Sequence, residues 1–193
     1  LLACKMCPEP VRKVVFTLYG SFSKTYHGHG TDRALLGGIL GFHTDDARIR
    51  DAFEWAEKMG VEYEFVIDEE TKTDHPNTAD MDITGVNGYR LSVRGESIGG
   101  GKIKIVRING IDVEFTGEYS TLIVRQIDKP GVVAHITQCL SKEEVNIAFM
   151  RLFREDKGAT AFTVVESDEQ IPEEILAEIQ KNEHVQDLML VQM

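Results

Sequence analysis

The sequence predicts an α+β protein built from two domains, and three patterns along the chain lead to that prediction. The first half combines helical spacing with short β-branched strands, and it ends in a series of strands without helices. From Tyr119 onward, strands and helices follow the order βαββαβ. A chain of 193 residues is also long enough for two small domains. We therefore expect domains at 1–118 and 119–193, with the boundary near Gly117–Tyr119.

The composition limits the classes of protein to which the chain can belong. Hydrophobic residues make up 42% of the chain and charged residues 27%, as in ordinary soluble proteins. The net charge is −11 and the lysines and arginines are scattered, which argues against a nucleic-acid partner. No apolar run approaches the ~20 residues of a membrane helix, so we expect no membrane contact. No signal peptide is visible, but the chain begins at Leu1 rather than Met, so we expect its true N-terminus to be absent.

The cysteines favour a reducing, cytoplasmic location. There are three of them, an odd number, which argues against a disulfide scaffold. Cys4 and Cys7 lie in what looks like the end of a helix that Pro8 and Pro10 stop, and their spacing places both thiols on one face. Buried helical cysteines commonly pack as small hydrophobic side chains, and we prefer this interpretation to a metal or redox role. A cluster with four cysteine ligands cannot be built from this chain alone, and we expect no metal site in it.

The first domain is expected to begin with a buried strand at 13–20, a β-branched and aromatic run that ends in glycine. Apolar residues at helical spacing predict a helix at 49–59, which Gly60 ends. Asn109-Gly110 is a strong signal for a hairpin with a type I′ turn. Further strands are predicted at 62–67, 81–84, 89–95, 102–108 and 111–115.

The stretch Thr25–Gly41 combines a glycine-rich polar loop with a buried helix expected at 33–40. Asp32, or Thr31 before it, is expected to cap that helix. A helix N-terminus beside the imidazoles of His27 and His29 is a suitable place for a carboxylate. The alternative is a capped turn with exposed histidines, since a single glycine-rich turn is a weak signal.

Two other polar motifs follow in the first domain. The loop Asp74–Thr78 contains Pro76, which restricts the backbone of His75 to extended values, and it offers uncharged donors and acceptors. The stretch Ser97–Gly101 ends in three consecutive glycines whose N–H groups suit a carboxylate or a phosphate. The alternatives are a polar turn for the first motif and a flexible hairpin connection for the second.

The second domain is expected to have the ferredoxin-like order βαββαβ. Asp128-Lys129-Pro130-Gly131 forms a turn between its first strand and first helix, and Pro172 stands near the start of its second helix. Its strands are predicted at 120–126, 145–154, 160–166 and within 183–191, and its helices at 132–141 and 172–181.

The second domain resembles the ACT domains. The resemblance covers residues 120–193 and is carried by the turn Asp128–Gly131 and by Val145-Asn146-Ile147 at the entry of the second strand. It implies a module that binds small molecules, often amino acids, and that commonly pairs side by side with a second copy. Gly131 would lie close to a ligand, with Asn146 nearby.

The first domain resembles the β chain of the iron–sulfur-dependent L-serine dehydratases. Three motifs in this order carry the resemblance: Gly28-His29-Gly30-Thr31-Asp32, His75-Pro76-Asn77-Thr78 and Ser97-Ile98-Gly99-Gly100-Gly101. The resemblance implies a lyase subunit that acts on L-serine with an α chain, which carries a [4Fe–4S] cluster, and that forms homodimers through the ACT domain. The family's upstream Gly-Pro-Ser-Ser-Ser-His-Thr segment is absent, so we expect upstream residues to be missing from this sequence.

The same resemblance implies roles for individual residues. Ser97 and the N–H groups of Gly99, Gly100 and Gly101 would hold the substrate carboxylate. His29 and His75 would be catalytic, with His29 as an acid, a base or a supporting group. The other substrate-binding residues would be Thr31, Asp32, Asn77 and Thr78.

Two alternatives remain at this stage. The first domain also resembles the regulatory serine-binding domain that accompanies an ACT domain in some 3-phosphoglycerate dehydrogenases, which implies a sensor without chemistry. The chain lacks a nucleotide-binding G-x-G-x-x-G, because no third glycine follows Gly28-His29-Gly30 at the required spacing. The second alternative is a stand-alone ligand-binding ACT protein.

Overall fold

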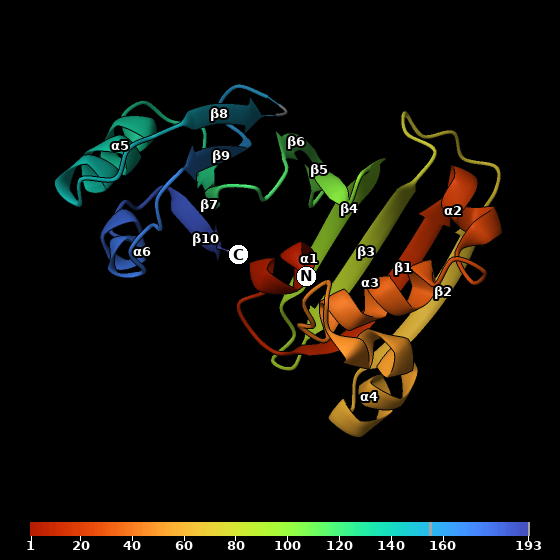
Figure 1. Ribbon diagram of the computed structural model, residues 1–193. Helices are drawn as coiled ribbons and strands as arrows, with labels where there is room; N and C mark the ends of the chain where they lie inside the picture. The colour runs from red at the N-terminus through yellow and green to blue at the C-terminus, as the bar shows by residue number, and fades with distance from the viewer. Residues whose placement is uncertain (155, 193) are drawn as a thin grey trace. The chain divides into compact units, whose positions relative to one another are not determined.

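The computed structural model describes residues 1–154 and 156–192, and the chain divides into two compact units between Gly110 and Ile111. Strand β6 (Ile111–Phe115) is grouped with the second unit, although it is the edge strand of the sheet on which the first unit is built. Mixed α/β secondary structure with two sheets agrees with the predicted α+β class (Figure 1).

The first unit is built on a six-stranded sheet whose strands follow the order β2-β1-β3-β4-β5-β6. The first two strands are parallel and the others antiparallel. Val14, Phe16 and Leu18 alternate along β1 and are fully buried, as expected for the covered face of a sheet. The strands of this unit are β1 (Val11–Tyr19), β2 (Glu62–Asp68), β3 (Thr78–Gly85), β4 (Arg90–Gly99) and β5 (Lys102–Ile108).

Helices between β1 and β2 lie over one face of this sheet (Figure 1). The opposite face carries the alternate residues of the strands, including the cross-strand partners Thr17, Asp80 and Arg94. This face is therefore polar. These helices are α2 (Gly20–Thr25), α3 (Thr31–Ile39), the 3₁₀ helix η1 (Ala47–Asp51) and α4 (Ala52–Met59), and the short helix α1 (Leu2–Met6) precedes β1.

The expected cap of α3 is wrong. The helix begins at Thr31, two residues before the predicted start, and its N-cap is Gly30 in the left-handed conformation with φ 69°. Asp32 lies in the first turn, where its carboxylate accepts a hydrogen bond from the Arg33 N–H at 2.8 Å. The side chain still satisfies a helix N–H that has no intrahelical partner, but it does so from inside the helix.

Several element bounds also differ from the prediction. The helix expected at 49–59 is divided into η1 and α4, and α2 occupies residues expected to be a connection. Local hydrogen bonds support α2, because the hydroxyl of Ser23 donates to Gly20 O and that of Thr25 to Ser21 O. Strands β3 and β4 are longer than predicted, because Thr78 pairs with Glu96 beyond the predicted ends.

The hairpin prediction at Asn109-Gly110 is confirmed. Both residues have positive φ, 48° and 86°, as a type I′ turn requires. Asn109 also holds β4, since its side-chain oxygen accepts a hydrogen bond from the Ser92 N–H at 2.9 Å.

The second unit has an antiparallel sheet in the order β10-β7-β9-β8, and the expected βαββαβ arrangement is confirmed. Strand β6 packs against β8 and β9. Strand β8 starts at Phe149 rather than at 145, because Glu144 turns the chain with φ 57° and buried Val145 packs into the core. The other elements are β7 (Ser120–Ile127), α5 (Val132–Lys142), β8 (Phe149–Arg154), β9 (Thr160–Ser167), α6 (Glu174–Ile179) and β10 (Val185–Val191).

One hydrophobic core holds the helices of the second unit to its sheet. Alternate residues of β7, among them Leu122 and Val124, meet Val132, Ile136 and Leu140 of α5 and are fully buried. Across the described residues of the whole chain, no helix is both long enough and apolar enough to span a membrane.

Candidate functional site

The second and third motifs meet at one end of the β3–β4 strand pair. Thr78 begins β3 and is paired with Glu96, and just beyond this pair the Ser97 N–H donates to Asn77 O at 2.9 Å. The fold therefore brings the His75–Thr78 loop and the glycine segment side by side.

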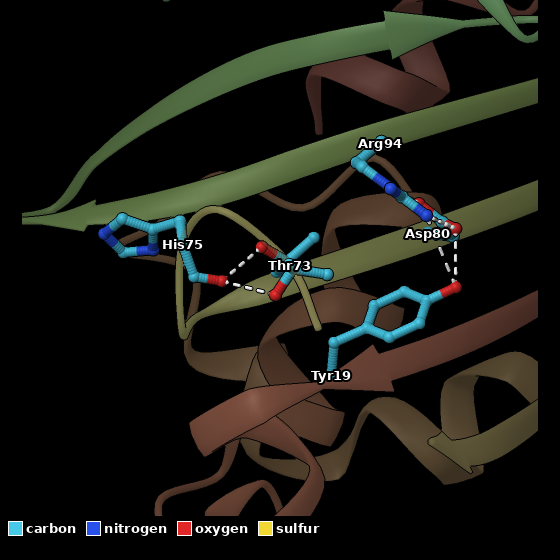
Figure 2. Close-up of polar contacts among 6 residues, drawn as sticks. Tyr19, Thr73, His75, Asp80 and Arg94 are labelled. Atoms are coloured by element: carbon cyan, nitrogen blue, oxygen red, sulfur yellow. Dashed lines mark hydrogen bonds and ion pairs between the residues drawn. The ribbon is translucent and has the colours of Figure 1, made fainter. Parts of the chain in front are cut away.

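Hydrogen bonds within the loop hold His75 in place. The hydroxyls of Thr73 and Thr78 both donate to His75 O, at 2.8 and 2.6 Å (Figure 2). The Asn77 N–H donates to His75 Nδ1 at 3.2 Å. Thr78 is completely buried, so its hydroxyl supports the loop from within.

Helix α2 fixes the same loop from the other side. The Ser21 N–H donates to Pro76 O at 2.6 Å. Gly20 has φ +55°, and a Cβ added there would lie 2.5 Å from Pro76 O, so the close approach requires glycine. Because α2 continues into the histidine loop, this contact connects the first motif with the second.

In the histidine loop, the structure pairs His27 rather than His29 with the buried carboxylate. His27 Nδ1 lies 2.8 Å from Asp32 Oδ2, and the Asp32 side chain is 3% exposed. His29 is exposed, and its ring contacts no described residue through a hydrogen bond or ion pair. Half-buried Thr31 donates its N–H to Tyr26 O at 2.8 Å. His29 is thus the histidine of this loop with both ring nitrogens available to a ligand.

The three glycines of the third motif are exposed and left-handed. Gly99, Gly100 and Gly101 have φ of 88°, 62° and 77°. Side chains with a Cβ rarely adopt this conformation, so the segment requires glycine and leaves its backbone open to a ligand. Ser97 precedes them at the end of β4 and is half-buried.

Sequence reasoning missed a polar network on the face of the sheet that the helices leave open. Asp80 accepts hydrogen bonds from Arg94 Nε at 2.6 Å, from Arg94 Nη2 at 2.7 Å and from the Tyr19 hydroxyl at 2.8 Å (Figure 2). Burial, followed by the hydrogen bond to Asp80, raises the pKa of Tyr19 to about 12. The hydrogen bonds to Asp80 raise the pKa of the Arg94 guanidinium. The available signal was a charged residue inside one expected strand, Arg94, and another just before the preceding strand, Asp80, but the register between the strands was not predictable from the sequence.

The raised pKa of Tyr19 predicts a loss of stability in alkali. The folded chain favours the neutral phenol, whose ordinary pKa is about 10. The stabilisation is therefore complete below pH 10 and is lost as pH rises through about 12. Tyrosinate absorbance, followed as pH rises, should show a late step for this residue among the five tyrosines. Tyr19→Phe should remove that step, and a titration unchanged by the substitution would contradict the assignment.

In the second unit, the candidate ligand residues lie on the surface. Gly131 is the exposed N-cap of α5 with φ 92°, and Asn146 is exposed with its N–H 3.3 Å from Glu169 Oε2. The turn before Gly131 is anchored by Asp128, which accepts hydrogen bonds from Arg154 Nη1 at 2.7 Å and from the Gly158 N–H at 3.2 Å. The hydrogen bond from Arg154 is the largest cause that lowers the pKa of the Asp128 carboxyl, and the hydrogen bond from Gly158 adds to it.

The cysteines have the properties of packed thiols. Burial raises the pKa of Cys4, Cys7 and Cys139, which disfavours the thiolate that metal binding and redox chemistry use. This supports the interpretation of the C-x-x-C pattern as hydrophobic packing.

Comparison with known proteins agrees with the geometry. Residues 2–106 match the family model of the serine dehydratase beta chain, and residues 120–184 match the ACT domain. The chain is 40% identical over 173 residues to a probable L-serine dehydratase, beta chain, of Bacillus subtilis, covering 90% of this chain and 77% of that protein. It is 41% identical to the L-serine dehydratase, beta chain, of Peptoniphilus asaccharolyticus, covering 92% and 80%.

A more distant similarity extends to D-3-phosphoglycerate dehydrogenase of Bacillus subtilis. The two sequences are 25% identical over a region that covers 92% of this chain and 34% of the dehydrogenase. The higher identity and the coverage of most of both proteins favour the serine dehydratases. The chain therefore belongs to the serine dehydratase beta chain family, with an ACT domain following the family's own domain.

Proposed function

We propose that this chain is the β subunit of an L-serine ammonia-lyase that converts L-serine to pyruvate and ammonia. The observation that carries the proposal is the meeting of the His75–Thr78 loop with the Ser97–Gly101 segment, through the hydrogen bond from the Ser97 N–H to Asn77 O. Relatives that are about 40% identical carry the name of L-serine dehydratase beta chains.

The reaction needs a proton removed from Cα and a β-hydroxyl expelled. In the proposal, Ser97 and the exposed backbone of Gly99–Gly101 bind the substrate carboxylate, since backbone N–H groups stabilise such an anion. His29 moves the proton, because its ring is exposed and has no partner among the described residues. His75 and Asn77 orient the substrate from the adjacent loop. Thr31 and Asp32 position the histidine loop at the start of α3.

The residues of this chain do not fit an iron–sulfur cluster. Within 1–154 and 156–192, no group of three or more His, Cys, Asp or Glu side chains is gathered as a metal-ligand set. The proposal therefore places the [4Fe–4S] cluster on a partner α chain.

The ACT domain is proposed to bring two β subunits together. Strand β8 lies at one edge of its sheet and exposes Phe149 and Leu152, each 45% accessible. Apolar side chains on an edge strand favour pairing with another strand. An amino acid is proposed to bind near Gly131 and Asn146, and the enzyme to work in the cytoplasm.

The regulatory alternative takes its support from the similarity to D-3-phosphoglycerate dehydrogenase over 92% of this chain. In this alternative, the same loops bind serine without chemistry.

Anaerobic co-expression with the partner α chain distinguishes the lyase from the regulatory module. Pyruvate formation from L-serine is expected from the purified complex and not from this chain alone. A stable complex without activity, together with calorimetric binding of L-serine to this chain alone, would reject the lyase in favour of the regulatory module.

A further inference from the structure

The ring of His75 is fixed in one tautomer by its own loop. The backbone N–H of Asn77 donates to Nδ1, so Nδ1 is an acceptor and carries no proton. A neutral imidazole has a single proton, which must then lie on Nε2. A proton on Nδ1 would face the Asn77 N–H and lose this hydrogen bond.

The loop has little freedom to release that contact. Three successive backbone carbonyl groups of the loop accept hydrogen bonds. His75 O accepts from two threonine hydroxyls, Pro76 O from the Ser21 N–H and Asn77 O from the Ser97 N–H. The Asn77 N–H is therefore held towards the ring from both neighbouring elements.

Resting on the proposed function, we propose that neutral His75 acts as a hydrogen-bond donor through Nε2–H to the carboxylate of the bound amino acid, and not as the base. Nε2 forms no hydrogen bond with a described residue. Figure 2 shows the ring directed away from the Tyr19–Asp80–Arg94 network. The hydrogen bond from the Ser97 N–H to Asn77 O joins this loop to the glycine segment, so we expect one anion to receive both Nε2–H and glycine N–H groups.

This assignment separates the roles of the two catalytic candidates. His29 has no partner on either ring nitrogen and can accept a proton, whereas the available nitrogen of His75 already carries one. The specificity for a carboxylate ligand then comes from His75 and the glycine segment together.

The first test is nitrogen NMR of the full chain labelled at histidine, at neutral pH. His75 should show an unprotonated Nδ1 and a protonated Nε2, whereas exposed His43 should show exchange between tautomers. A protonated Nδ1 on His75 would overturn the proposal whatever the activity of the complex.

The second test compares two substitutions in the complex with the α chain. The amide of His75→Gln keeps an N–H donor near Nε2 and cannot act as a base, whereas His75→Leu has no donor. His75→Leu should raise the KM for L-serine by about 10- to 100-fold, as expected for a lost hydrogen bond to a charged group. His75→Gln should keep the KM close to that of the unchanged chain. Equal losses in two folded variants would overturn the donor role.

A complex without turnover would reject the proposed function, but it would still allow the donor role to be tested. Serine affinity would then be measured by calorimetry on the same variants. Weaker serine binding by His75→Leu than by His75→Gln would support the donor role of His75. Equal serine binding by the two variants, or no binding by either, would overturn it.

Discussion

Replacing His29 by alanine is expected to lower serine turnover by the complex by about 10²- to 10⁴-fold, the usual contribution of a positioned acid or base. The ring is exposed and has no partner among the described residues, so its removal should leave the fold intact. The loss should appear in kcat, because the role is proton transfer rather than binding.

The controls for this prediction come from the other histidines. His43→Ala removes an exposed imidazole outside the motifs and should leave turnover unchanged. Urea unfolding of each variant would show that the fold is retained. Normal turnover in folded His29→Ala would mean that another group moves the proton.

Replacing Asp80 by alanine is expected to lower the free energy of unfolding by about 1.5–3 kcal/mol, the range for hydrogen bonds to charged groups. The substitution leaves Arg94 and the Tyr19 hydroxyl without their common acceptor. The side chains of Asp80 and Arg94 are only 19% and 22% exposed, so water replaces the lost hydrogen bonds incompletely.

A double-mutant cycle would measure the interaction between Asp80 and Arg94. It compares urea unfolding of the unchanged chain, Asp80→Ala, Arg94→Ala and the variant with both substitutions. Since the two residues are in contact, the double alanine variant should lose less stability than the sum of the single variants. Asp82→Ala, an exposed carboxylate two residues further along β3, is the matched control and should change stability little. Additive losses at Asp80 and Arg94 would show that the pair contributes no coupling.

The sequence by itself determined the order of the elements and the identity of the motifs. Alternating apolar residues and turn signals gave βαββαβ from Tyr119, and Asn109-Gly110 gave its hairpin, because these features depend on neighbouring residues. Local chemistry also identified the segments around His29, His75 and Gly99 as candidate binding elements.

Only the tertiary structure decided how those elements meet. The pairing of Asp80 with Arg94 and of Thr78 with Glu96 depends on the register between strands, which no local pattern specifies. The close approach of Gly20 to Pro76 O and the hydrogen bond from the Ser97 N–H to Asn77 O likewise join segments that are distant in the sequence. Long-range pairing fixes which groups face one another, and a sequence read locally specifies only which groups are present.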